Sequence, residues 1–192
     1  MIKLTDFRLI PPSPDVPKQY MVKWSGEPSK LFLVITSIKP VLTINGRERA
    51  VTLESEPFKE SVPIHQTNNP LPHELPRLPI STFSFELYDN DEGSGDGIAK
   101  EEAFIGQRIC FAKKAYLYQD DFVRVTLSCD YKIPKDLFWL KLTNRYPNIK
   151  FPLPEMQPCQ EGFQTAFLMK SDAYSLVEIN FHEKVKEMFV FS

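Results

Sequence analysis

The residues best suited to chemistry gather in one acidic, glycine-rich stretch, Phe83 to Gly106, which reads FSFELYDNDEGSGDGIAKEEAFIG. Hard cations such as calcium bind six to eight oxygen atoms, and carboxylates at alternating positions of a flexible loop supply them. The stretch therefore predicts a calcium site, with a solvated Asp- and Gly-rich turn as the alternative. An EF-hand does not fit, because Lys100 occupies the position of its bidentate glutamate. The candidate ligands are Asp89, Asp91, Glu92 and Asp96.

Catalytic motifs are missing from the sequence. There is no Gly-x-Ser-x-Gly elbow, no phosphate-binding glycine loop followed by Lys-Ser or Lys-Thr, and no His-Glu-x-x-His. The histidines are read as loop residues, with a weak metal site as the alternative for the first two: His65, His73 and His182. The cysteines lack metal-ligand spacing and suit thiols in a reducing compartment: Cys110, Cys129 and Cys159. We therefore expect a protein that is not an enzyme.

Charge and hydropathy limit the partners. The net charge is −2, from 23 basic and 25 acidic residues, so no global field attracts a polyanion and nucleic acid is not an expected partner. The first residues, MIKLTDFRLIPPSPD, lack the basic segment and the long apolar segment that a secretory signal contains. The longest apolar run, Leu31 to Ile35, is far below the ~20 residues of a membrane span. We expect a cytoplasmic protein. Attachment to the surface of a membrane is compatible with this location.

The elements that would hold the acidic loop are strands. The 17 prolines are about 9% of the chain against a usual ~5%, and proline favours short strands and rigid loops over long helices. The length fits one domain over 1–192, with a core at about 19–181. Asn45-Gly46 between two apolar runs predicts a hairpin with a tight primed turn. Strands are expected near 2–10, 19–24, 31–37, 40–45, 48–53, 82–88, 105–112, 121–128, 137–142, 163–169 and 174–181.

Two segments interrupt this pattern. The insertion 54–80 holds six prolines between Pro57 and Pro79, so we expect a long surface loop that no strand or helix crosses. Its Pro76-Arg77-Leu78-Pro79 could bind a proline-recognition domain, against the simpler interpretation of a stiff connection. A C-terminal extension covers 182–192, where His182 to Met188 has helical spacing and predicts a single turn.

Around the acidic loop the chain resembles a C2 domain. Leu87-Tyr88-Asp89-Asn90-Asp91 and Phe104-Ile105-Gly106 are similar to the family's strand end and following strand start. Thr67-Asn68-Asn69-Pro70 with Glu74 resembles its Asn-Pro turn, and Phe138 to Leu142 its Trp-bearing strand. The resemblance covers roughly 31–181, and Leu176 to Phe181 would be the closing strand.

The resemblance implies an all-β, antiparallel two-sheet sandwich of eight strands with little helix. In some members the apical loops bind calcium and anionic phospholipid, and in others they bind proteins. The loop that should supply further acids reads Thr36-Ser37-Ile38-Lys39-Pro40, with no carboxylate and one lysine. An ammonium group repels a divalent cation, which favours a calcium-independent member.

The expected function is therefore a non-catalytic interaction module that binds a protein partner or assembles into a larger complex. The alternatives are a calcium-dependent domain that binds phospholipid membranes and a calcium-stabilised carbohydrate-binding sandwich. Calcium is the one cofactor suggested. An anionic membrane surface could contact scattered basic residues, and exposed aromatics could anchor an interface, although solvated faces and core positions are the simpler interpretations. These residues are Arg47, Arg49, Lys113, Lys114, Lys132, Lys135, Lys141 and Arg145, and Phe7, Tyr20, Trp24 and Tyr118.

Overall fold

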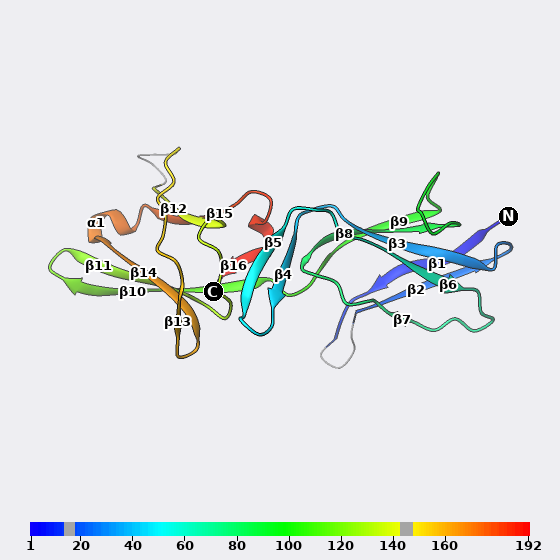
Figure 1. Cartoon of the computed structure of the whole chain (residues 1–192), viewed down its shortest axis with the longest axis horizontal. Coiled ribbons are helices and arrows are strands. Elements are labelled where there is room, and N and C mark those ends of the chain that lie inside the picture. The colour runs from blue at the N-terminus through cyan, green and yellow to red at the C-terminus, as the bar shows by residue number, and fades with distance from the viewer. Residues whose placement is uncertain (14–17, 143–147) are drawn as a thin grey trace. The chain divides into compact units, whose positions relative to one another are not determined.

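The computed structural model describes residues 1–13, 18–142 and 148–192, and nearly all of its regular structure is β (Figure 1). The expected all-β fold with little helix is confirmed. In the described ranges the helices are α1 (Ser171–Tyr174) and η1 (Lys186–Met188), and neither is long and apolar enough to cross a membrane. The chain divides into two compact units: unit 1 holds residues 1–41 and 55–106, and unit 2 holds 42–54 and 107–192. A single domain over 1–192 stays a prediction.

Unit 1 contains two sheets. The first has the order β1-β2-β7, from β1 (Lys3–Ile10), β2 (Gln19–Ser25) and β7 (His73–Glu74). The second has the order β6-β3-β8-β9, from β6 (Lys59–His65), β3 (Lys30–Ser37), β8 (Ser81–Tyr88) and β9 (Ala99–Ile105). All the strand pairs within these two sheets are antiparallel.

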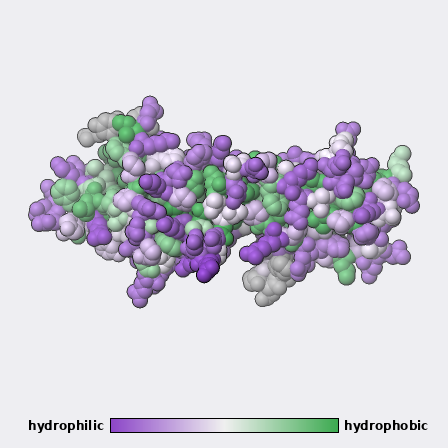
Figure 2. Space-filling model, viewed as in Figure 1, coloured by the Kyte–Doolittle hydropathy of each residue, from purple (hydrophilic) through white to green (hydrophobic). Residues whose placement is uncertain are grey.

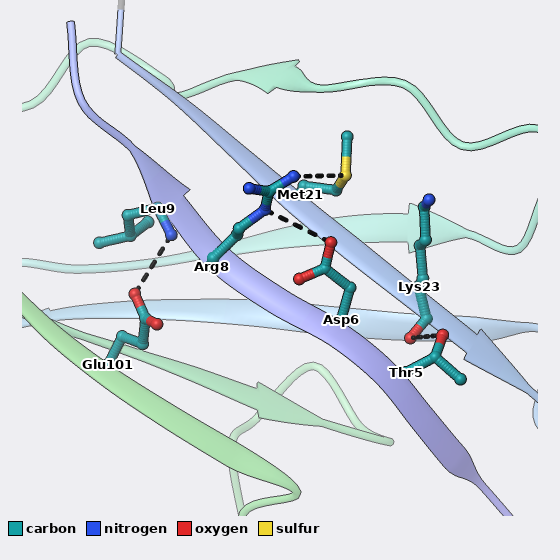
Figure 3. Close-up of polar contacts among 7 residues, drawn as sticks. All are labelled: Thr5, Asp6, Arg8, Leu9, Met21, Lys23 and Glu101. Carbon is teal, nitrogen blue, oxygen red and sulfur yellow. Dashed lines mark hydrogen bonds and ion pairs between the residues drawn. The ribbon is translucent and has the colours of Figure 1, made fainter.

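Both sheets of unit 1 contribute to one hydrophobic core. β8 was expected as a strand near 82–88, and its alternate residues Phe83, Phe85 and Leu87 have no exposed surface. They belong to the same core as apolar residues of β2 such as Trp24. Each such side chain contributes about 1.5–3 kcal/mol by leaving water. Between the sheets, the Leu9 amide of β1 donates a hydrogen bond to the Glu101 carboxylate of β9 at 3.1 Å (Figure 3).

The proline-rich interval differs from the expectation, because β6 and β7 both lie within it. Pro63 stands in β6 opposite Phe32 of β3. A proline is tolerated in a strand when that strand forms the edge of a sheet, since its missing amide hydrogen then removes no ladder bond. β6 is such an edge strand. The expectation that no strand crosses 54–80 was therefore wrong.

Unit 2 is built on a five-stranded sheet of order β13-β14-β11-β10-β16. Its strands are β13 (Gln157–Cys159), β14 (Gly162–Lys170), β11 (Phe122–Cys129), β10 (Ile109–Gln119) and β16 (Phe189–Phe191). Two further pairs are β12 (Phe138–Leu142) with β15 (Val177–Phe181), and β4 (Val41–Asn45) with β5 (Ala50–Glu54). β16 pairs with β10 in parallel, whereas the pairs β10–β11, β11–β14, β13–β14 and β12–β15 are antiparallel.

An aromatic cluster forms the core of unit 2. The Phe111 ring is completely buried. Its centroid lies within 5.3–5.8 Å of four other rings, those of Phe138, Phe181, Phe189 and Phe191. Together with Phe111, these rings come from four different strands, so the cluster joins the pair β12–β15 to the five-stranded sheet.

The turn at Asn45-Gly46 joins two paired strands as expected but is longer than a two-residue primed turn. The Asn45 side-chain oxygen accepts hydrogen bonds from the amides of Arg47 and Glu48, at 3.0 and 3.3 Å. The positive φ, 53°, falls on Arg49. The side-chain bonds of Asn45 thus stabilise a four-residue connection in place of the tighter one.

Candidate functional site

The predicted calcium ligands lie in the loop 89–98, which joins the antiparallel pair β8 and β9. Asn90 organises this loop. Its amide nitrogen donates to the Asp89 carboxylate at 3.0 Å and to the Ser94 carbonyl at 2.9 Å, and its side-chain oxygen accepts from the Ser94 amide at 2.9 Å. The Asn90 side chain therefore stabilises the first half of the loop, from Asp89 to Ser94.

The four acids themselves, Asp89, Asp91, Glu92 and Asp96, are all exposed. Among the residues outside 14–17 and 143–147, no group of three or more His, Cys, Asp or Glu side chains is arranged to hold a metal ion. The Lys59 ammonium donates to the Glu92 carbonyl at 2.9 Å, which brings a positive charge to the loop. The calcium site stays a prediction.

At the base of the loop the Tyr88 hydroxyl donates a hydrogen bond to the Glu86 carboxylate. This bond holds the pKa of Glu86 below its usual value and raises the pKa of Tyr88 above its own. Lys100 lies 3.6 Å from the same carboxylate and 3.1 Å from that of Glu102. Glu86, Lys100 and Glu102 thus form a polar network on β8 and β9, and it belongs to the sheet rather than to the loop.

The other residues singled out from the sequence are dispersed. His73 stacks on Tyr20 with ring centroids 5.4 Å apart. Tyr20 and Trp24 are buried in the core of unit 1, so they are not available as interface anchors, whereas Tyr118 is 58% exposed. Arg145 lies outside the described residues.

A second surface emerges in unit 2, where three adjacent strands extend beyond their neighbours (Figure 1). We call these segments the blade: residues 112–119 of β10, 122–126 of β11 and 166–170 of β14. Large apolar side chains are exposed on it to an unusual degree, namely Tyr116 (57%), Leu117 (82%), Tyr118 (58%), Phe122 (42%) and Leu168 (52%).

The strand register sorts these side chains onto two faces. In β11 the residues Val123 and Val125 are buried, so Phe122 and Arg124 point to the opposite face. Pairing then places Tyr116, Arg124 and Leu168 in one row across the three strands. We call this the outer face and define it by six of its side chains, those of Lys114, Tyr116, Phe122, Arg124, Leu168 and Lys170.

The outer face combines apolar and positively charged side chains. Figure 2 shows hydrophobic and hydrophilic residues side by side at the end of unit 2 that carries the hairpin β10–β11. Lys114, Arg124 and Lys170 are its three cations, and its six residues include no carboxylate. Such a surface is suited to an apolar partner that carries negative charge.

A groove of about 550 Å³ continues the outer face along the sheet. Tyr116 and Lys114 line it near the blade, and Cys110, Ser128 and Cys159 line it further along. Burial raises the pKa of the Cys129 thiol, which also borders the groove. That thiol is therefore a weak nucleophile at neutral pH.

Sequence reasoning missed this face. It placed the end of a strand near residue 112, whereas β10 continues to Gln119. The signal was the run Lys113 to Tyr118, KKAYLY, which has strong β propensity and no turn residue.

No family model matches the chain, and no curated protein sequence matches it.

Proposed function

We propose that the protein is a non-catalytic interaction module whose outer face binds an acidic, apolar segment of a partner protein. The observation that carries the proposal is the row Tyr116–Arg124–Leu168, in which both apolar side chains are more than half exposed. Tyrosine and arginine are, with tryptophan, the residues enriched at the energetic centres of protein interfaces.

Exposure and charge together support a protein partner. Three adjacent strands of the outer face each expose a large apolar side chain, namely Tyr116, Phe122 and Leu168. Exposed apolar groups that gather on one face are typical of interaction sites. The three cations around them would steer an acidic partner and fix its orientation. An acidic peptide bearing aromatic or aliphatic side chains satisfies both requirements.

We also propose a C2-like sandwich for the fold and a cytoplasmic location. β8 ends with Leu87-Tyr88, and Asp89 opens the acidic loop, which supports the resemblance to a C2 domain. The three cysteines are free, which suits a reducing compartment. In this proposal the loop 89–98 is a structural connection, and binding belongs to the outer face.

The second candidate function is binding to an anionic membrane surface. Lys114, Arg124 and Lys170 would attract anionic headgroups, at about 1 kcal/mol for each charge near the leaflet. Tyr116 and Phe122 could enter the interfacial layer. The same face therefore supports both candidates, and a direct comparison separates them.

A displayed peptide library tests the proposal. Selection on the wild-type chain should enrich acidic peptides that carry aromatic or aliphatic residues, and Arg124→Glu should weaken their binding about tenfold or more. Arg47→Glu is the matched control, because it makes the same charge change in the exposed turn between β4 and β5. The control should bind like the wild type.

Vesicles that contain phosphatidylserine test the second candidate, binding to an anionic membrane surface. Sedimentation of the chain with these vesicles, lost in Arg124→Glu, together with no peptide enrichment, would favour the membrane function. Equal peptide binding by the wild type and Arg124→Glu would contradict the outer face as the binding site.

A further inference from the structure

The blade has an open edge along β10. In the five-stranded sheet β10 lies between β11 and β16, but β16 pairs with it only at Ile109–Phe111. Beyond Phe111, within the described parts of the chain, no strand pairs with β10 on the side away from β11. Residues 112–119 therefore present an unpaired strand edge.

The direction of the main-chain groups along this edge follows from one hydrogen bond. The Phe111 carbonyl accepts a bond from the Ser192 amide at 3.0 Å, so it points away from β11. Main-chain groups alternate in direction along a strand. The amide and carbonyl groups of Lys113, Ala115 and Leu117 therefore also point to the free edge, and those of Lys114 and Tyr116 point to β11.

Side chains leave this edge accessible. Ala115 is exposed and small, and Leu117 is 82% exposed. A regular strand edge with exposed apolar residues is a template for pairing with another strand. Charged residues normally protect such an edge, so the positions of Lys113 and Lys114 decide which strand can pair with it.

We propose that β10 pairs with β10 of a second copy of this chain, antiparallel and around a two-fold axis at Ala115. Two blades then form one continuous sheet. This pairing uses the main-chain edge of the blade. Lys114 and Tyr116 of the outer face lie along that edge, but the pairing does not depend on the binding of a partner protein.

The sequence of β10 is complementary to itself in this register. Lys113 lies opposite Leu117 of the second copy, in pairs that exchange main-chain hydrogen bonds. Lys114 lies opposite Tyr116 of the second copy, where a lysine and an aromatic ring attract each other. No lysine faces a lysine, whereas a register centred on Lys114 would place the two copies of Lys114 directly opposite each other and is disfavoured.

Two features of the structure limit the paired segment. At one end the Phe111 carbonyl is already bound by Ser192. At the other end the register of β10 and β11 shifts between Leu117 and Gln119, which marks a bulge. The middle of the regular edge between these limits lies near Ala115. This is the residue at which we place the two-fold axis.

Sedimentation equilibrium of the whole chain, from micromolar to submillimolar concentration, tests the proposal. The wild type should show a monomer–dimer equilibrium. Leu117→Lys places a lysine opposite Lys113 of the second copy, twice in the dimer, and should raise the dissociation constant about tenfold or more. Leu168→Lys is the matched control, since it adds the same charge on an exposed position of β14 away from this edge. It should dimerise like the wild type.

The double variant Lys113→Glu/Leu117→Lys tests the register. It restores opposite charges across the two-fold axis and should recover the dimer. Because the Lys113 ammonium lies 4.8 Å from the centre of the Tyr174 ring, the thermal melting of the double variant is measured in parallel to confirm that it is folded. A monomeric wild type at every concentration, an unchanged dimer in Leu117→Lys, or a folded double variant that stays monomeric would each overturn the proposal.

Discussion

The Tyr88 hydroxyl donates a hydrogen bond to the carboxylate of Glu86, its neighbour on the same face of β8. The bond lies at the base of the acidic loop, where Lys100 of β9 approaches the same carboxylate at 3.6 Å. It couples the ionisation of both groups to folding, because it requires a protonated hydroxyl and is strongest with an ionised carboxylate.

Replacement of this hydroxyl has a predictable pH dependence. Tyr88→Phe should lower the free energy of unfolding by about 1 kcal/mol at neutral pH, the usual value for a lost hydrogen bond. The lowered pKa of Glu86 means that its contribution is present above the unfolded pKa of about 4.3 and is lost as pH falls through the folded value. The raised pKa of Tyr88 means that its contribution is present below about 10 and is lost as pH rises through the folded value.

Urea unfolding of the wild type and Tyr88→Phe across this pH range measures the difference. It should be constant from about pH 5 to 9 and should shrink towards both extremes. A difference that grows below pH 4 would have the wrong sign for a hydrogen bond to an ionised Glu86.

The aromatic cluster of unit 2 should be sensitive to truncation at its centre. Phe111 is completely buried and contacts four other rings. Phe111→Ala should therefore lower the free energy of unfolding by about 3–5 kcal/mol. Hydrogen exchange should accelerate in β10, β11 and β16. Phe122→Ala, at a 42% exposed position of β11, is the control and should change stability by less than about 0.5 kcal/mol. Equal effects of the two changes would argue against the cluster as the core.

Gly106 should not tolerate a side chain. Its φ is 110°, and an added Cβ would lie 2.8 Å from Cγ1 and 3.1 Å from Cα of Ile80. Gly106→Ala should therefore cost about 1–3 kcal/mol. Gly95 also has a positive φ, 84°, but nothing lies within 4 Å of an added Cβ, so Gly95→Ala isolates the backbone cost. The melting temperature of Gly106→Ala should be well below that of Gly95→Ala. The reverse order would be inconsistent with the contact between Gly106 and Ile80.

Calcium should leave the stability of the chain unchanged. The acids of the loop 89–98 are exposed, no described group of three is arranged around a cation, and Lys59 contacts the loop. A ligand that binds only the folded state raises the melting temperature. Melting with and without millimolar calcium checks this. A rise of several degrees that disappears in Asp91→Asn would restore the calcium-dependent alternative.

Local alternation was enough to predict many of the strands. Val123 and Val125 turn inward in β11 and Phe83 and Phe85 do so in β8, because burial of one face produces a two-residue period that the sequence displays directly. β6 was missed since the six prolines of its neighbourhood suggested a loop. Only the sheet order reveals that Pro63 lies on an edge.

The outer face could not be predicted, because it depends on register between distant strands. Arg124 and Leu168 are 44 positions apart in the sequence and meet only through the β11–β14 pairing. The acidic loop, by contrast, is contiguous in the sequence, and all the predicted calcium ligands were therefore assigned to it. Contiguous polar residues are visible in a sequence, whereas a surface assembled from three strands is not.

Photo-crosslinking in an extract of the native source tests the central claim most directly. A photoreactive phenylalanine analogue replaces Phe122 on the outer face, and the same analogue replaces Leu71, a 68% exposed apolar residue of unit 1, as the control. The proposed function predicts one discrete protein adduct at position 122, absent at position 71 and lost when Arg124→Glu is added. Adducts of equal yield at both positions, or an adduct at 122 that survives Arg124→Glu, would contradict it.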